Sequence, residues 1–100
     1  MSPFGLAGHV LEQILGVLRD HPLVERAVIY GSRATGTFKP HSDIDIAFYA
    51  PSMEDAEAAR LRFELRELPI VFKVDAVHVE RLGNAALRDK IVREGKALYP

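Results

Sequence analysis

The sequence predicts an α/β (α+β) fold in which a small mixed sheet of three or more strands is flanked by helices. Three segments carry a helical repeat of apolar residues, and the segments between them have the alternation or the continuous apolar run of strands. Of the 100 residues, 48% are hydrophobic and 27% are charged, as in an ordinary globular protein. We therefore expect residues 1–100 to form a single domain.

The first predicted element is a helix over residues 3–19, because apolar residues recur there at i, i+3, i+4 and i+7. These residues are Leu11, Ile14, Leu15 and Leu18. Ser2 and Pro3 suit the N-cap and the first turn of such a helix. Pro22 follows the repeat and ends the helix, because proline has no backbone N–H to donate.

Two strands joined by a loop are expected next. Residues 27–30 are a continuous apolar run that ends at Gly31, which is typical of a strand buried on both faces. Residues 32–42 are rich in Ser, Thr, Gly and Pro and predict a loop, opened by a short helical turn at Ser32. Residues 43–49 alternate in character, so this second strand carries two aspartates on one face.

The second half of the chain continues with helix, strand and helix. Ser52 is the expected N-cap of a helix that ends at Pro69. Residues 71–79 are rich in valine and alternate as a third strand. A final helix is expected over residues 82–94, with Gly95 at its C-terminal cap.

Charge and composition narrow the classes of partner and compartment. The chain has 13 Lys and Arg against 14 Asp and Glu, a net charge of −1, and therefore lacks the broad positive surface that nucleic-acid binding requires. It has no cysteine, which excludes disulfides and thiolate zinc sites and favours the cytoplasm. The N-terminus lacks the apolar run of a signal peptide or a membrane span, so no membrane partner is expected.

The candidate site is a combination of glycine, serine and aspartate residues. Gly31 and Ser32 end the first strand, and Asp43 and Asp45 lie in the second. Side chains at i and i+2 of a strand point the same way, so two carboxylates can converge on hard cations such as Mg²⁺. Paired cations can stabilise the attacking and the leaving oxygen of a phosphoryl transfer. Asp75 in the third strand would complete the cluster, while Gly31 allows the backbone to approach a phosphate closely.

Each part of this combination also has a purely structural interpretation. An Asp-x-Asp pair is commonly the solvent-facing half of an amphipathic strand. Asp75 has Lys73 or an arginine of a neighbouring element as a possible ion-pair partner. The joint pattern favours a site, because carboxylates in an apolar segment are costly unless a cation or solvent compensates them. The four histidines share no spacing that suits a metal centre, and structural or exposed positions are expected for them.

Residues 31–46 resemble the signature of the DNA polymerase β-like nucleotidyltransferases, in particular their minimal stand-alone (MNT) branch. The signature is a hydrophobic residue and Gly-Ser, about ten further residues, and then Asp-hydrophobic-Asp-hydrophobic. This chain has Gly31-Ser32 and then Asp43-Ile44-Asp45-Ile46. Residues 73–77 look like the family's third-carboxylate strand and residues 87–99 like its closing helix, so the resemblance covers nearly the whole chain.

The resemblance implies a role for each residue of the site. Asp43 and Asp45 would hold divalent metals, and Asp75 would complete the metal site or accept the proton of the nucleophile. Three consecutive residues would bind the nucleotide triphosphate. These are Gly31, Ser32 and Arg33. Many relatives have a basic residue at the position of Thr35 and an acidic or small one at that of His41, so contacts to the nucleotide tail or the acceptor are expected to differ.

The resemblance also implies a reaction and a partner. Stand-alone members typically transfer AMP from ATP, with Mg²⁺, to a tyrosine of a HEPN-domain toxin and so act as its antitoxin, in the manner of a type VII system. A chain of this length has no residues for a second domain that holds the acceptor, so the partner would supply that side of the active site. The sequence is compatible with a homo-oligomer.

Two other classes of function compete with this one. The first is a non-catalytic binding module that masks its partner, against which the presence of all three aspartates argues. The second is an RNA-modifying transferase that works with a separate subunit, which the lack of a basic surface disfavours.

Overall fold

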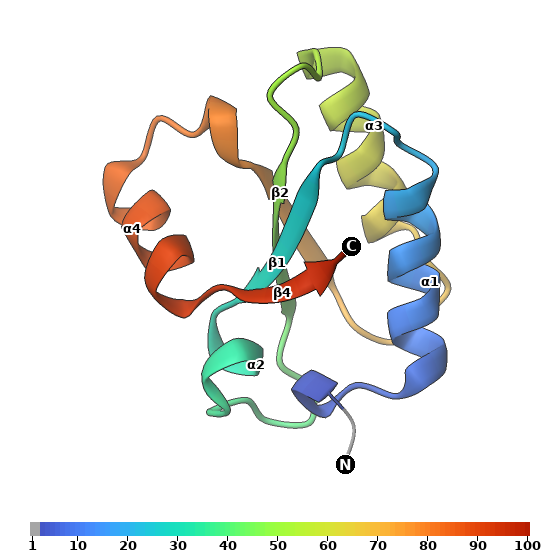
Figure 1. Ribbon diagram of the computed structural model, residues 1–100. Helices are drawn as coiled ribbons and strands as arrows, with labels where there is room; N and C mark the ends of the chain where they lie inside the picture. The colour runs from blue at the N-terminus through green and yellow to red at the C-terminus, as the bar shows by residue number, and fades with distance from the viewer. Residues whose placement is uncertain (1–2) are drawn as a thin grey trace.

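The computed structural model describes residues 3–100, which form one four-stranded sheet with helices on both faces (Figure 1). The strands are β1 (Arg26–Tyr30), β2 (Ile44–Tyr49), β3 (Val74–His78) and β4 (Lys96–Tyr99). The helices are α1 (Gly8–Arg19), α2 (Ser32–Thr35), α3 (Asp55–Arg66) and α4 (Ala85–Glu94), with 3₁₀ turns η1 (Pro3–Gly5) and η2 (Val79–Arg81). In the sheet order β3-β2-β1-β4, β1 is antiparallel to β2 and β4, whereas β2 and β3 are parallel. The predicted mixed sheet flanked by helices is confirmed.

The helices cover the two faces of the sheet unequally. α1 and α3 pack on one face, where the larger core includes Ile14 and Leu61. α4 lies on the other face, where Ile91 belongs to a smaller cluster with Val28 and Ala47. Figure 1 shows α1 and α3 together on one side of the sheet and α4 on the opposite side. The face under α4 is therefore the less covered of the two and can carry polar groups.

Alternation along β2 decides which face each of its side chains takes. Ile44, Ile46 and Phe48 are fully buried in the larger core, as the sequence pattern predicts. Ala47 belongs to the cluster under α4, so Asp45, two residues before it, lies on that face as well. β2 thus buries one row of side chains and turns its carboxylate toward the less covered face.

The predicted helix over residues 3–19 is wrong at its start. The chain forms η1 and then α1 instead, because Phe4 (φ 58°) and Gly5 (φ 69°) take left-handed backbone conformations that no α-helix contains. The Phe4 carbonyl accepts a hydrogen bond of 3.0 Å from Arg33 Nη1, a tertiary contact that a local pattern does not reveal. The expected N-cap, Ser2, lies outside the described residues.

The sequence analysis missed β4, which follows α4 after one residue. The family resemblance implied a helix over residues 87–99, but residues 96–99 pair with β1. Gly95 ends α4, and a Cβ there would lie 2.5 Å from the Ile91 carbonyl oxygen and 3.0 Å from Val28 Cγ2. The four residues of β4 are all at least partly exposed, so no buried face marks them as a strand.

The two long helices of the second half begin later than predicted. α3 has Glu54 rather than Ser52 at its N-cap. α4 begins at Ala85, because the Asn84 side chain accepts a backbone hydrogen bond of 3.1 Å in its first turn. Within residues 3–100, none of the helices is long and apolar enough to cross a membrane.

His21 connects the end of α1 to α3. It is 4% exposed, and its ring nitrogens lie 3.0 Å from Glu57 Oε2 and 2.7 Å from Glu64 Oε1. Burial by itself lowers the pKa of His21, but the hydrogen bonds and charges of the two glutamates outweigh it and raise the pKa above 6.5. Only the imidazolium can donate to both carboxylates at once, so the charged form holds the helices together.

The stability of the fold should therefore fall as pH rises. The His21 pKa is higher in the folded than in the unfolded protein, so its contribution is complete below about pH 6.5 and is lost as pH passes the raised value. We expect His21→Gln to lower the free energy of unfolding by about 1 kcal/mol at about pH 6 and by less at about pH 9, measured by urea denaturation. His41→Gln, in an exposed loop, is the control. An equal loss at both pH values would contradict the ionic role.

Candidate active site

The Gly31–Ser32 turn lies directly against the carboxylate of Asp45. β1 ends at Tyr30, Gly31 takes φ 77° and ψ −157°, and α2 begins at Ser32. A Cβ placed on Gly31 would be 2.6 Å from Asp45 Oδ2, so only glycine leaves room for the carboxylate. Two parts of the predicted site, which are separated in the sequence, are therefore in contact.

Asp75 lies beside Asp45 in the sheet. The two residues are register partners in the parallel pair β2·β3, and Tyr30 is the partner of Asp45 in the antiparallel pair β1·β2. Register partners on neighbouring strands point to the same face, so both carboxylates lie on the face under α4. Asp43 precedes β2 by one residue and is exposed to solvent. The fold thus brings the predicted acids of the second and third strands together in one row.

The electrostatics of the site centre on Asp45. Burial raises the pKa of Asp45, and the negative charges of Asp75, Asp43 and Glu94 raise it further, while Lys90 lowers it. Burial also raises the pKa of the neighbouring Tyr30 to about 12, with Asp45 and Asp75 adding to the effect. Negative charge therefore accumulates on this face, and Lys90 offsets only part of its effect on Asp45.

The donor chemistry of the cluster fits Mg²⁺. Among residues 3–100, no three acidic or histidine side chains lie close enough together to form a preformed metal centre. Mg²⁺ does not require one, because it usually keeps several waters and binds one or two carboxylates together with substrate phosphates. Asp43, Asp45 and Asp75 supply only carboxylate oxygens, and the raised pKa of Asp45 shows a charge that a cation would compensate.

The ion-pair interpretation of Asp75 also has a contact in the structure. Lys73 Nζ lies 3.7 Å from Asp75 Oδ2, with the two side chains 60% and 38% exposed. An exposed pair at this distance contributes little to stability. It leaves Asp75 accessible on the same face as Asp45.

Arg33 does not fit the predicted role of a phosphate contact. It is 3% exposed, and its guanidinium donates to the carbonyl oxygens of Ser42, Phe4 and Pro40 at 3.0 to 3.4 Å. The rings of Phe38 and Phe72 also lie 4.9 and 4.8 Å from the guanidinium carbon. Arg33 therefore fixes η1 and the loop between α2 and β2, which sets the path of the chain between the turn and the acids.

Glu94 is a residue of the site that the sequence analysis missed. Its Oε1 accepts a hydrogen bond of 3.0 Å from the Gly31 N–H, across 63 positions of the sequence. The available signal was its place in α4, since Leu87, Ile91 and Glu94 follow the i, i+4, i+7 repeat of a buried stripe. A carboxylate that continues an apolar stripe indicates a polar partner in the core-facing direction.

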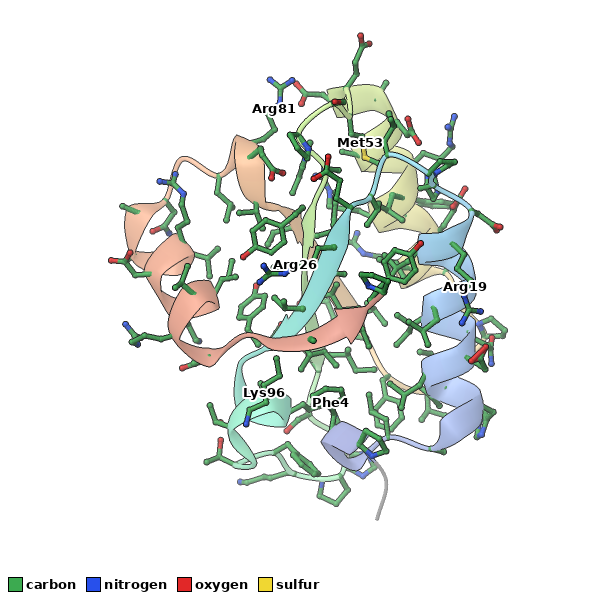
Figure 2. All side chains as sticks on the ribbon, in the orientation of Figure 1. Phe4, Arg19, Arg26, Met53, Arg81 and Lys96 are labelled. Atoms are coloured by element: carbon green, nitrogen blue, oxygen red, sulfur yellow. The ribbon has the colours of Figure 1, made fainter. Side chains whose placement is uncertain are left out.

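A hollow of about 680 Å³ borders α2, the short helix that follows the Gly31 turn. Its walls include Phe4, Phe38 and Lys96, and Figure 2 shows Phe4 and Lys96 beside α2. The predicted site residue Arg33 is among its lining residues, whereas the three aspartates are not, so the hollow borders the turn side of the site rather than the acidic cluster.

A glycine turn held against one carboxylate, with a second carboxylate on the next strand, suits the transfer of a nucleotidyl group. The turn can take the triphosphate, and the acids can take the cations that polarise it. The chain is accordingly a nucleotidyltransferase. The family model "Polymerase beta, Nucleotidyltransferase" matches residues 12–100, and the chain belongs to this family.

Solved structures of toxin–antitoxin pairs share this fold. A crystal structure of a toxin–antitoxin with AMP-PNP is 28% identical, with a TM-score of 0.73 over 89% of this chain and 72% of that chain. An MntA–HpeT variant in which a tyrosine is replaced by alanine is 30% identical, with a TM-score of 0.70 over 88% and 70%. The structure of a tri-AMPylated Shewanella oneidensis HEPN toxin in complex with MNT antitoxin is 25% identical, with a TM-score of 0.68 over 91% of this chain and 70% of that chain. No curated protein sequence matches the chain. The predicted resemblance to the MNT branch is confirmed.

Proposed function

We propose that this nucleotidyltransferase transfers AMP from ATP to a tyrosine hydroxyl of a HEPN-domain toxin and thereby acts as a type VII-like antitoxin. The observation that carries the proposal is the contact of the Gly31 turn with Asp45, beside Asp75 on the next strand. Two of the similar structures support the choice of nucleotide and partner, since one contains AMP-PNP and another a tri-AMPylated HEPN toxin. We assign the reaction to the cytoplasm, where ATP is formed and consumed.

Each residue of the site has a part in this reaction. Asp43, Asp45 and Asp75 would hold Mg²⁺, which supplies charge neutralisation for the triphosphate. Gly31 lets the backbone come close to the phosphates, and the Ser32 hydroxyl, which makes no hydrogen bond within residues 3–100, is free to donate to one. The site thus offers a carboxylate end and a hydroxyl end to the same ligand.

The transfer itself exchanges one phosphorus–oxygen bond for another. The tyrosine oxygen forms a bond to the α-phosphorus of ATP while the bond from that phosphorus to the bridging oxygen breaks, and pyrophosphate leaves. Asp75, whose side chain is 38% exposed in the edge strand β3, is the acid that would accept the proton of the tyrosine hydroxyl. Positioning and charge stabilisation supply the remaining rate enhancement.

The proposal is tested by weighing the toxin. The protein is incubated with a HEPN-domain toxin, ATP and MgCl₂, and the toxin is analysed by intact mass spectrometry. We expect the toxin to gain one or more AMP units with the wild type, and to gain none when EDTA is present from the start or when Asp43 is replaced by asparagine. A toxin that is inhibited equally by the wild type and by Asp43→Asn, with no gain in mass, would overturn transfer and establish the binding module.

A further inference from the structure

The Gly31 N–H has a side-chain partner in place of a strand partner. Pairing between β1 and β4 ends at Ile29↔Lys96, so the Gly31 N–H lies beyond the last paired residue. The Glu94 carboxylate accepts this N–H at 3.0 Å. A side chain of α4 therefore continues the hydrogen bonding of β1 into the turn of the active site.

Glu94 is held in place by the residues around it. Ile91, one turn earlier in α4, is 1% exposed and packs against the sheet. Gly95, the next residue, is so close to β1 that a Cβ would lie 3.0 Å from Val28 Cγ2. The end of α4 consequently cannot shift without disturbing the packed face of the sheet, and Glu94 is a rigid support for the turn.

Gly31 is enclosed by carboxylates on two sides. Asp45 Oδ2 lies 2.6 Å from the position that a Cβ of Gly31 would take, and Glu94 Oε1 lies 3.0 Å from the Gly31 nitrogen. The position of Gly31 therefore sets the distance between Ser32 and Asp45, the two ends of the proposed nucleotide site. A turn that lost its contact with Glu94 would be free to move relative to Asp45.

The bond to Glu94 also has an electrostatic cost. Glu94 adds negative charge near Asp45, where Asp75 and Asp43 already act and Lys90 is the cation that acts in the other direction. An uncharged oxygen acceptor could make the same hydrogen bond without this repulsion. This difference allows the hydrogen bond and the charge to be separated by experiment.

We propose that Glu94 is a positioning residue of the active site, whose hydrogen bond to the Gly31 N–H holds the Gly31–Ser32 turn at the correct distance from Asp45 for the triphosphate. The inference rests on the proposed function, since it concerns the same nucleotide. In this arrangement the Gly31 N–H donates to Glu94 rather than to a phosphate, and Ser32 is the residue that donates to the phosphate.

The chain offers a matched control. Glu80 Oε1 accepts a hydrogen bond of 2.9 Å from the Ala50 N–H, so it makes the same kind of contact between a carboxylate and a backbone amide. Ala50 follows β2 at the end of the strand opposite to Asp45, away from the acidic cluster. Glu80→Ala thus removes a bond of the same kind, together with a 3.5 Å contact to His78 Nε2, without touching the turn.

The test compares Glu94→Ala, Glu94→Gln and Glu80→Ala with the wild type. The binding of AMP-PNP with MgCl₂ is measured by calorimetry, and KM for ATP and kcat are measured by toxin labelling. We expect Glu94→Ala to raise Kd and KM about 10-fold, because one hydrogen bond to a charged group is lost, while Glu94→Gln stays within about 3-fold of the wild type. Glu80→Ala should lower Tm but leave Kd and KM unchanged.

Three results would overturn the role of Glu94. The first is that Glu94→Ala binds AMP-PNP as tightly as the wild type. The second is that Glu94→Ala binds AMP-PNP more tightly, which would make Glu94 a competitor of the phosphates. The third is that Glu94→Gln loses as much binding as Glu94→Ala. A wild type that binds AMP-PNP but never labels the toxin would overturn the proposed transfer, while the comparison of Kd values would still decide on Glu94. A wild type that does not bind AMP-PNP would overturn both.

Discussion

Replacing Asp45 by asparagine is expected to reduce AMP transfer by at least about 10³-fold and to make the metal-free fold more stable. Asp45 lies against the Gly31 turn and beside Asp75, so it links the turn to the second carboxylate of the proposed site. An amide keeps the shape of the side chain but removes the charge that would hold Mg²⁺. The loss of several kcal/mol of charge stabilisation gives the expected size of the effect.

The gain in stability follows from the pKa of Asp45. Burial and the charges of Asp75 and Asp43 raise this pKa in the folded protein. A carboxyl whose pKa is raised by folding binds its proton more tightly in the folded than in the unfolded protein. Its ionisation therefore lowers the stability of the fold as pH rises from the pKa of the unfolded state through the pKa of the folded state. That cost grows as pH rises through the raised pKa, and asparagine removes it because it carries no ionisable proton.

The two effects are measured together. Thermal unfolding in EDTA should show a Tm for Asp45→Asn that is higher by a few degrees, since about 1 kcal/mol corresponds to roughly 4–8 °C in a domain of this size. Asp89→Asn makes the same chemical change at an exposed position of α4 and should alter neither Tm nor transfer. A variant that loses transfer because it unfolds, with a lower Tm, would contradict the assignment.

The sequence predicted those parts of the site that depend on one segment. Alternation in β2 places Asp45 opposite the buried row of Ile44 and Ile46, and the apolar run before Gly31 identifies β1. These patterns act within a few residues, and burial enforces them. The sequence offered Asp75 as the acid of the third strand, but its pairing with Asp45 depends in addition on the register of β2 and β3, which no pattern within one strand specifies.

The parts that could not be predicted depend on contacts between distant segments. Phe4 breaks the first helix where its carbonyl meets Arg33, which is itself buried between two aromatic rings rather than directed at a phosphate. Glu94 reaches Gly31 only because the chain reverses at Gly95 and β4 pairs with β1. A buried arginine and a glutamate in an apolar stripe each have a partner that only the folded structure identifies.

Replacing Gly31 by alanine is expected to reduce both stability and transfer. The backbone at φ 77° and ψ −157° lies in a region that is essentially restricted to glycine. We therefore expect alanine to lower the free energy of unfolding by about 1–3 kcal/mol. The added methyl group would lie 2.6 Å from Asp45 Oδ2 and would push the carboxylate away from the turn. Since a shift of about 1 Å in a reacting group can cost about 10²-fold in rate, we expect a loss of that size in transfer.

Gly36→Ala separates the two causes. Gly36 has a positive φ of 84° as well, but no atom lies within 4 Å of a Cβ built there. Alanine at this position should cost about 1 kcal/mol in urea denaturation through backbone strain, with kcat and KM unchanged. If the loss of AMP transfer in both variants were proportional to their loss of stability, the contact between Gly31 and Asp45 would have no role in catalysis. A loss confined to Gly31→Ala would show that the turn sets the position of the carboxylate.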